Sequence, residues 1–337
     1  MSDPRIHPRD ALFDATPRPP ALPVCDHYSG VEVRMRKSLE LQAELGPVFD
    51  VTLDCEDGAP LGGEAEHACL AGELAAGAAN RFERVGARVH PVDHASFGQD
   101  VATLVARAGH RLAYLMVPKV AGRTDVDIAC AEIDRQQDAC GQSRRVPVHV
   151  LIETHGALRD VEAIAAHPRV QSLSFGLMDF VSAHHGAIPA AAMGVPGQFT
   201  HPLVIRAKLA VAAACHGHGK TPSHCVVTEL NDEQAIHAAA RRAATELAYT
   251  RMWSIHPHQI RPIVQAFAPD PGEVQESIDI LVAAQDAHWA PVRHRVGTRS
   301  TLHDRASYRY HWQLLERAQR TGQALPAPVL QRFFVTS

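Results

Sequence analysis

The chain has 337 residues, of which 46% are hydrophobic and 21% are charged, and these fractions are typical of a globular protein. A formal net charge of −4 argues against general nucleic-acid binding. No apolar stretch reaches the length of about 18 residues that a transmembrane helix needs, and the N-terminus has no apolar core like that of a signal peptide. Seven scattered cysteines without a CxxC pair indicate reduced thiols. We therefore predict a cytoplasmic protein with no nucleic-acid or membrane partner.

The chain alternates short apolar runs with amphipathic stretches after a proline-rich start. Residues 1–23 contain six prolines, and we predict an N-terminal arm there. The apolar runs predict strands at 24–28, 49–54, 87–92, 112–118, 148–153, 170–175, 223–227 and 252–256. The stretches between them predict helices at 31–45, 64–80, 97–108, 126–140, 158–166, 203–215 and 232–248, the last with Asn231 as its N-cap.

Eight strands alternating with helices predict a parallel sheet. Because neither GxGxxG nor GxxxxGK[ST] occurs, we predict a closed (β/α)₈ TIM barrel over residues 24–271 rather than an open doubly wound sheet. Beyond Pro271 the pattern predicts a C-terminal helical extension, residues 272–337, with helices at 273–287 and 306–321 and a loop between them. Such an extension can act as a lid or as an oligomer contact.

Two acids follow neighbouring strands of this barrel. Glu153 ends the fifth apolar run, and Asp179 comes shortly after the sixth. Chemistry in a TIM barrel lies at the carboxyl ends of the strands, where two carboxylates suit one Mg²⁺ ion. Acids at strand ends also cap the helices that follow, and the spacing alone leaves the metal site and the helix cap equally open.

Charged residues end three other strands on the same face. Asp54, Glu56 and Asp57 lie within four residues. They predict either support for a metal site with salt bridges to Arg88 or Lys119, or a solvated acidic turn. Arg88 predicts a clamp on a substrate carboxylate or enolate oxygen, or else a structural salt bridge to Glu56 or Asp57. Lys119 has the same two interpretations, substrate binding and a structural ion pair.

Six motifs in this order resemble the citrate lyase β-subunit/HpcH–HpaI aldolase superfamily, on its CoA-ester lyase branch, which includes malyl-CoA and citramalyl-CoA lyases. The resemblance covers nearly the whole chain from residue 24. The motifs are Leu53-Asp54-Cys55-Glu56-Asp57, Arg88-Val89-His90-Pro91, Val117-Pro118-Lys119-Val120, Ile152-Glu153-Thr154-His155-Gly156, Phe175-Gly176-Leu177-Met178-Asp179 and Ile255-His256-Pro257-His258-Gln259-Ile260.

The resemblance implies a TIM-barrel carbon–carbon lyase that binds Mg²⁺, or Mn²⁺ in its place, through Glu153 and Asp179. It implies cleavage or formation of a 3-hydroxyacyl thioester such as citryl-, citramalyl- or malyl-CoA by retro-Claisen or aldol chemistry. Arg88 is then the clamp, with Glu56 and Asp57 orienting Arg88, Lys119 or metal-bound water. Asp304 matches an acid that reaches a neighbouring subunit's active site, which implies a homo-oligomer, a trimer or hexamer; capping of the final helix is the alternative role.

The chain departs from the family pattern at His90, at Met178 and in the segment from Cys25 to Gly30. Because of these departures, the resemblance does not determine the acyl group of the substrate or its carrier. Three alternatives to the CoA-ester lyase therefore stand: a class II pyruvate-type aldolase of a free 2-oxo or hydroxy acid, a hydrolase that releases free CoA, and a non-catalytic subunit on the same scaffold.

Overall fold

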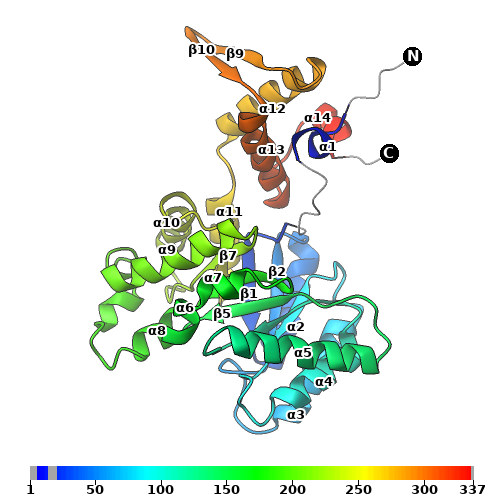
Figure 1. Ribbon diagram of the computed structural model, residues 1–337, viewed down its shortest axis with the longest axis vertical. Helices are drawn as coiled ribbons and strands as arrows, with labels where there is room; N and C mark the ends of the chain where they lie inside the picture. Colours follow the sequence, from blue (N-terminus) through cyan, green and yellow to red (C-terminus); the bar gives the residue numbers. More distant parts are fainter. Residues whose placement is uncertain (1–5, 14–20, 335–337) are drawn as a thin grey trace. The chain divides into compact units, whose positions relative to one another are not determined.

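The computed structural model describes residues 6–13 and 21–334, which form two compact units (Figure 1). The first unit comprises residues 21–267, and the second comprises residues 268–334 together with residues 6–13. Of the predicted N-terminal arm, residues 1–5 and 14–20 lie outside the described part. No helix in that part combines the length and the apolarity that crossing a bilayer requires.

The first unit is a closed barrel of eight parallel strands in sequence order, with β1 paired to both β2 and β8. The predicted (β/α)₈ barrel is therefore confirmed. Its strands are β1 (Cys25–Ser29), β2 (Phe49–Asp54), β3 (Val85–Arg88), β4 (Leu112–Val117), β5 (Val148–Ile152), β6 (Val170–Phe175), β7 (Thr221–His224) and β8 (Arg251–Ser254).

Helices connect these strands, and neighbours such as α3, α4 and α5 pack side by side outside the sheet (Figure 1). The predicted helix 158–166 is instead two short helices, because the chain turns at Asp160. The predicted cap at Asn231 is also wrong: Asp232 is the N-cap, and its side chain accepts from the Ala235 N–H at 2.9 Å. The helices are α2 (Glu32–Leu45), α3 (Glu64–Ala76), α4 (Phe97–Ala108), α5 (Arg123–Ala139), α6 (His155–Arg159), α7 (Val161–Ala165), α8 (Leu177–Ser182), α9 (Pro202–Gly217), α10 (Glu233–Glu246) and α11 (Pro257–Phe267), with short 3₁₀ turns η1 (Ala190–Met193) and η2 (Gly197–Phe199).

An ion-pair network fills part of the barrel interior. Arg251 on β8 is fully buried and contacts Asp26 at 2.9 Å and Asp50 at 2.5 Å. The hydroxyls of Tyr114 and Thr52 donate to Asp26 at 2.9 and 2.7 Å. Since a buried carboxylate is costly without partners, these bonds are what makes a charged barrel interior tolerable. The alternate residues of the same strands point outward and pack under the helices in the main apolar core.

The second unit has its own apolar core, built around the buried Trp312 and Leu315. The predicted loop between its two long helices is wrong in part, because it contains an antiparallel hairpin. Helix α1, from the predicted arm, buries Leu12 in this core, and His7 Nε2 lies 2.8 Å from the Phe333 carbonyl oxygen. The elements are α1 (Pro8–Leu12), α12 (Pro271–Asp286), β9 (Val292–Val296), β10 (Arg299–His303), α13 (Arg305–Arg320) and α14 (Ala327–Phe333).

Candidate active site

Glu153 and Asp179 follow two neighbouring strands, β5 and β6, whose last residues Ile152 and Phe175 are paired. Glu153 is only 3% exposed, and Asp179 lies in the first turn of α8. Gly176 lies between the two acids in the sequence, directly after the last residue of β6. A side-chain carbon at Gly176 would lie 2.2 Å from Glu153 Oε2, so only glycine lets the backbone pass against this carboxylate.

The two acids interact electrostatically. Burial, together with the nearby Asp179 carboxylate, raises the pKa of Glu153 to about 8. The backbone N–H of Lys119 donates to Glu153 Oε1 at 2.6 Å. Across the described residues, no basic side chain forms an ion pair with either acid, and no third acid, histidine or cysteine joins them to form a larger ligand group. Two oxygen-donor side chains that no described basic side chain pairs with suit a hard divalent cation that keeps several water ligands.

Arg88, the last residue of β3, is fixed by two acids from the end of β2. Its Nε and Nη2 donate to the two carboxylate oxygens of Asp54 at 2.7 and 2.5 Å, and Nη1 lies 3.1 Å from Glu56 Oε2. Asp54 also accepts the backbone N–H groups of Glu56 and Gly58. Because a guanidinium carries five N–H groups, two of them remain for a ligand.

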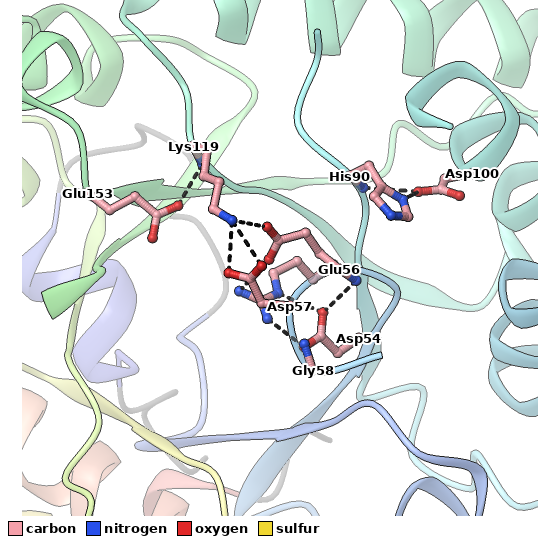
Figure 2. A network of polar contacts seen from close by, with 9 residues as sticks. Asp54, Glu56, Asp57, Gly58, His90, Asp100, Lys119 and Glu153 are labelled. Carbon is pink, nitrogen blue, oxygen red and sulfur yellow. Dashed lines mark hydrogen bonds and ion pairs between the residues drawn. The ribbon is translucent and has the colours of Figure 1, made fainter. Parts of the chain in front are cut away.

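Lys119 extends this chain of charges toward the metal-binding candidates (Figure 2). Its ammonium donates to Glu56 Oε1 at 2.5 Å and to Asp57 Oδ2 at 2.9 Å, so both acids lie within reach of one cation. These contacts raise the pKa of Lys119 above its ordinary value, although desolvation acts in the opposite direction. The structure thus brings Arg88, Lys119, Glu56 and Asp57 together. Asp54, which the sequence analysis grouped with Glu56 and Asp57, belongs to the same cluster through its contact with Arg88.

His90 and Asp100 form a pair that the sequence analysis did not identify. Asp100 Oδ2 accepts the backbone N–H of His90 at 3.0 Å and lies 2.6 Å from His90 Nδ1 (Figure 2). The His90 N–H therefore leaves the strand ladder, so β3 ends at Arg88 and the predicted strand at 87–92 is wrong beyond that residue. The sequence shows only that Asp100 follows His90 by ten residues. This spacing indicates a contact only when the position of α4, which carries Asp100, is known.

Asp304 lies in the second unit, where it caps α13. Its Oδ1 accepts from the Ala306 N–H at 2.9 Å and from the Ser307 N–H at 3.4 Å. Helix capping, one of the two predicted roles of Asp304, is therefore present. The other role, in the active site of a neighbouring subunit, stays a prediction. The carboxylate is exposed, and the described residues offer its Oδ2 no hydrogen-bond donor.

Residues 51–257, most of the barrel, match the model of the HpcH/HpaI aldolase/citrate lyase family. The chain belongs to this family. It is therefore a carbon–carbon lyase, as the six motifs predicted.

Other members of the family show how far the likeness extends. An L-malyl-CoA/beta-methylmalyl-CoA lyase of Cereibacter sphaeroides is 29% identical over 288 residues, which cover 82% of this chain and 88% of that protein. The crystal structure of a citrate lyase from Burkholderia xenovorans is 52% identical, covers 97% of this chain and 100% of its own, and has a TM-score of 0.83. CitE from Mycobacterium tuberculosis, solved in complex with magnesium, acetoacetate and coenzyme A, is 17% identical with a TM-score of 0.66 over 89% of this chain and 99% of its own, and it shares the fold.

Proposed function

We propose that this family member is a Mg²⁺-dependent lyase that cleaves or forms a 3-hydroxyacyl-CoA thioester of the malyl, methylmalyl or citramalyl type. The observation that carries the proposal is the buried Glu153 beside Asp179 at the ends of β5 and β6, close to the fixed guanidinium of Arg88. Two relatives, 29% and 28% identical, are named as lyases of malyl-CoA and its methyl derivatives, and they support the thioester class.

Glu153 and Asp179 are the residues that would hold the metal, and Mn²⁺ can replace Mg²⁺ at such an oxygen-rich site. When bound, the ion supplies Lewis-acid polarisation of the substrate's carboxylate and adjacent oxygen. The Lys119 N–H fixes the Glu153 carboxylate, so this ligand is oriented before the ion arrives.

Arg88 binds the other fragment of the substrate, the acyl thioester. When the carbon–carbon bond breaks, its electron pair becomes the enolate of the acyl thioester, and the hydroxyl carbon becomes a carbonyl. The two uncommitted N–H groups of Arg88 can donate to the enolate oxygen as its charge develops. Asp54 and Glu56 hold the guanidinium in place. Lys119 forms ion pairs with the Glu56 and Asp57 carboxylates.

Two proton transfers complete the reaction: the hydroxyl loses one, and the enolate carbon gains one. We assign this acid–base role to Asp304 of a neighbouring subunit. The assignment requires a homo-oligomer, and a trimer or hexamer is part of the proposal, as is a cytoplasmic location.

The test is a panel of acyl-CoA thioesters and free hydroxy acids incubated with Mg²⁺. Released glyoxylate, pyruvate or oxaloacetate together with an acyl-CoA supports the thioester lyase. The same oxo acids from free hydroxy acids alone would indicate a class II aldolase instead. Free CoA without an oxo acid would indicate a hydrolase, and one relative, 25% identical over 59% of this chain, is named (3S)-malyl-CoA thioesterase.

Glu153→Gln and Asp179→Asn test the metal assignment in the same assay. Both variants should lose Mg²⁺-dependent turnover and measurable Mg²⁺ binding by calorimetry. Glu162→Gln, which changes an exposed acid, is the matched control. Full Mg²⁺-dependent turnover in either site variant contradicts the proposal, and a protein that neither binds Mg²⁺ nor turns over any substrate is a non-catalytic subunit.

A further inference from the structure

Two aromatic side chains in the barrel carry polar atoms without a partner. Tyr28 on β1 and Trp253 on β8 are 7% and 8% exposed, and their rings stack with centroids 4.4 Å apart. Tyr28 Oη and Trp253 Nε1 are buried, and neither atom has a hydrogen-bond partner among the described residues. A buried donor without an acceptor is destabilising, whereas phenylalanine would fill much of either space with no such penalty.

Apolar residues pack against this pair. Met116, Leu151 and Val226 form one buried cluster with it, and Met178 packs against that cluster. Such surroundings exclude water and strengthen any hydrogen bond made there. They also disfavour a charged ligand group, so the part of a ligand that lies here is hydrocarbon with one polar oxygen.

The pair lies near residues assigned to both halves of the substrate. The Arg88 guanidinium carbon is 5.6 Å from the centroid of the Tyr28 ring. Met178, which packs against the cluster, is the chain neighbour of Asp179. A substrate that touches both Arg88 and a metal on Asp179 therefore comes within reach of Tyr28 and Trp253.

We infer that Tyr28 Oη and Trp253 Nε1 donate hydrogen bonds to the thioester carbonyl oxygen of the substrate, which becomes the enolate oxygen during cleavage. They complete, with Arg88, an oxyanion hole formed by three residues. The inference rests on the proposed lyase function and deepens it. Two of these three residues are neutral and lie in an apolar cluster, so the site selects a thioester, whose carbonyl is uncharged, over a free carboxylate.

The first test removes one hydroxyl. Tyr28→Phe should lower kcat by about 10²-fold with little change in KM or in Mg²⁺ affinity. Its Tm should stay level or rise, because the lost hydroxyl has no hydrogen-bond partner among the residues that the structure describes. Unchanged kcat in Tyr28→Phe, with an active wild type, overturns this inference and leaves the lyase proposal standing.

Tyr114→Phe is the matched control in the same barrel. The Tyr114 hydroxyl donates to Asp26 and lies 2.6 Å from Thr52 Oγ1, so its loss should lower Tm and leave the turnover of the folded enzyme unchanged. A merely structural Tyr28 would behave like Tyr114, with a lower Tm and an unchanged kcat.

The second test observes the Trp253 indole directly. The chain has three tryptophans, and Trp253→Phe identifies the Trp253 indole N–H signal in protein labelled with ¹⁵N-tryptophan. Saturating acetyl-CoA with Mg²⁺ should shift this signal downfield and leave those of Trp289 and Trp312 in place. Binding of acetyl-CoA without that shift overturns the role of Trp253. Failure of any thioester to bind or react overturns the lyase proposal and this inference with it.

Discussion

Lys119 touches both halves of the candidate site, because its backbone N–H donates to Glu153 at 2.6 Å while its ammonium donates to Glu56 at 2.5 Å. Its φ of +50° places it in the left-handed region, which is uncommon for a residue with a side chain. A single residue in a strained backbone conformation thus links the metal-binding candidate to the residues that hold Arg88.

Lys119→Ala separates these two connections. The variant keeps the N–H and loses the ammonium, so Glu56 and Asp57 draw more strongly on Arg88 and displace it. We expect kcat to fall by up to about 10²-fold, while Mg²⁺ affinity measured by calorimetry stays near that of the wild type. Lys37→Ala, which removes an exposed lysine paired with Glu40, is the control and should change neither quantity. A large loss of Mg²⁺ affinity in Lys119→Ala would instead place the ammonium among the groups that shape the metal site.

Mg²⁺ binding should depend on pH through Glu153. The raised pKa, about 8, means that the metal-free folded protein holds a proton on Glu153 that the unfolded chain releases above about 4.5. This contribution to the stability of the metal-free protein is complete below the lower value and is lost as pH rises toward the upper one. An ion that binds the carboxylate must displace the proton, so apparent affinity should rise about tenfold per pH unit and level off above the Glu153 pKa.

Calorimetry in buffers of different ionisation enthalpy measures both quantities, the affinity and the protons released. Close to one proton should be released per ion bound below the Glu153 pKa, and none well above it. A flat affinity profile without proton release would show that Glu153 is already ionised before the ion binds.

Arg251→Met should test the charged barrel interior. The change leaves Asp26 buried with only two hydroxyl donors, although Arg84 still contacts Asp50 at 2.7 Å. Removing one partner of a buried ion pair costs about 3–5 kcal/mol of unfolding free energy. Denaturant unfolding measures this loss. Arg36→Met, which breaks an exposed pair with Glu32, should cost no more than about 0.5 kcal/mol.

Asp304→Asn distinguishes a helix cap from a catalytic acid. Asparagine caps a helix about as well as aspartate, so stability should be kept. If Asp304 moves a proton, kcat should fall by about 10²–10⁴-fold. Mixed oligomers of Asp304→Asn and Arg88→Ala chains should then regain activity, because some sites receive both intact residues from different subunits. Full activity of Asp304→Asn alone would leave Asp304 with its capping role only.

Local sequence patterns were sufficient to predict the strands and the polar residues that follow them. Alternating apolar and amphipathic segments identified all eight strands, and polar residues at strand ends identified Arg88, Glu153 and Asp179. The end of β3 could not be predicted, because it depends on a contact of the Asp100 carboxylate, which takes the His90 N–H out of the strand ladder. The C-terminal hairpin was missed because its strands are largely exposed and rich in arginine and histidine, so no apolar alternation identifies them.

The barrel interior could not be predicted from local patterns. Asp26 and Arg251 are separated in sequence by most of the unit, and each lies in a short strand of mixed polarity. The same holds for Tyr28 and Trp253, whose unpartnered atoms have meaning only once β1 and β8 are neighbours. Closure of the sheet creates these contacts, and closure is a property of the whole unit.

The pairing of Asp26 with Arg251 also bears on synthesis of the protein at the ribosome. β1 emerges early, but its carboxylate acquires its guanidinium partner only when β8, at the other end of the unit, has left the exit tunnel. A nascent chain that closes its sheet without β8 buries Asp26 without a counter-charge, which is unfavourable. The last strand is thus required for stable closure, and chains truncated before Arg251 should remain open and become substrates for proteases.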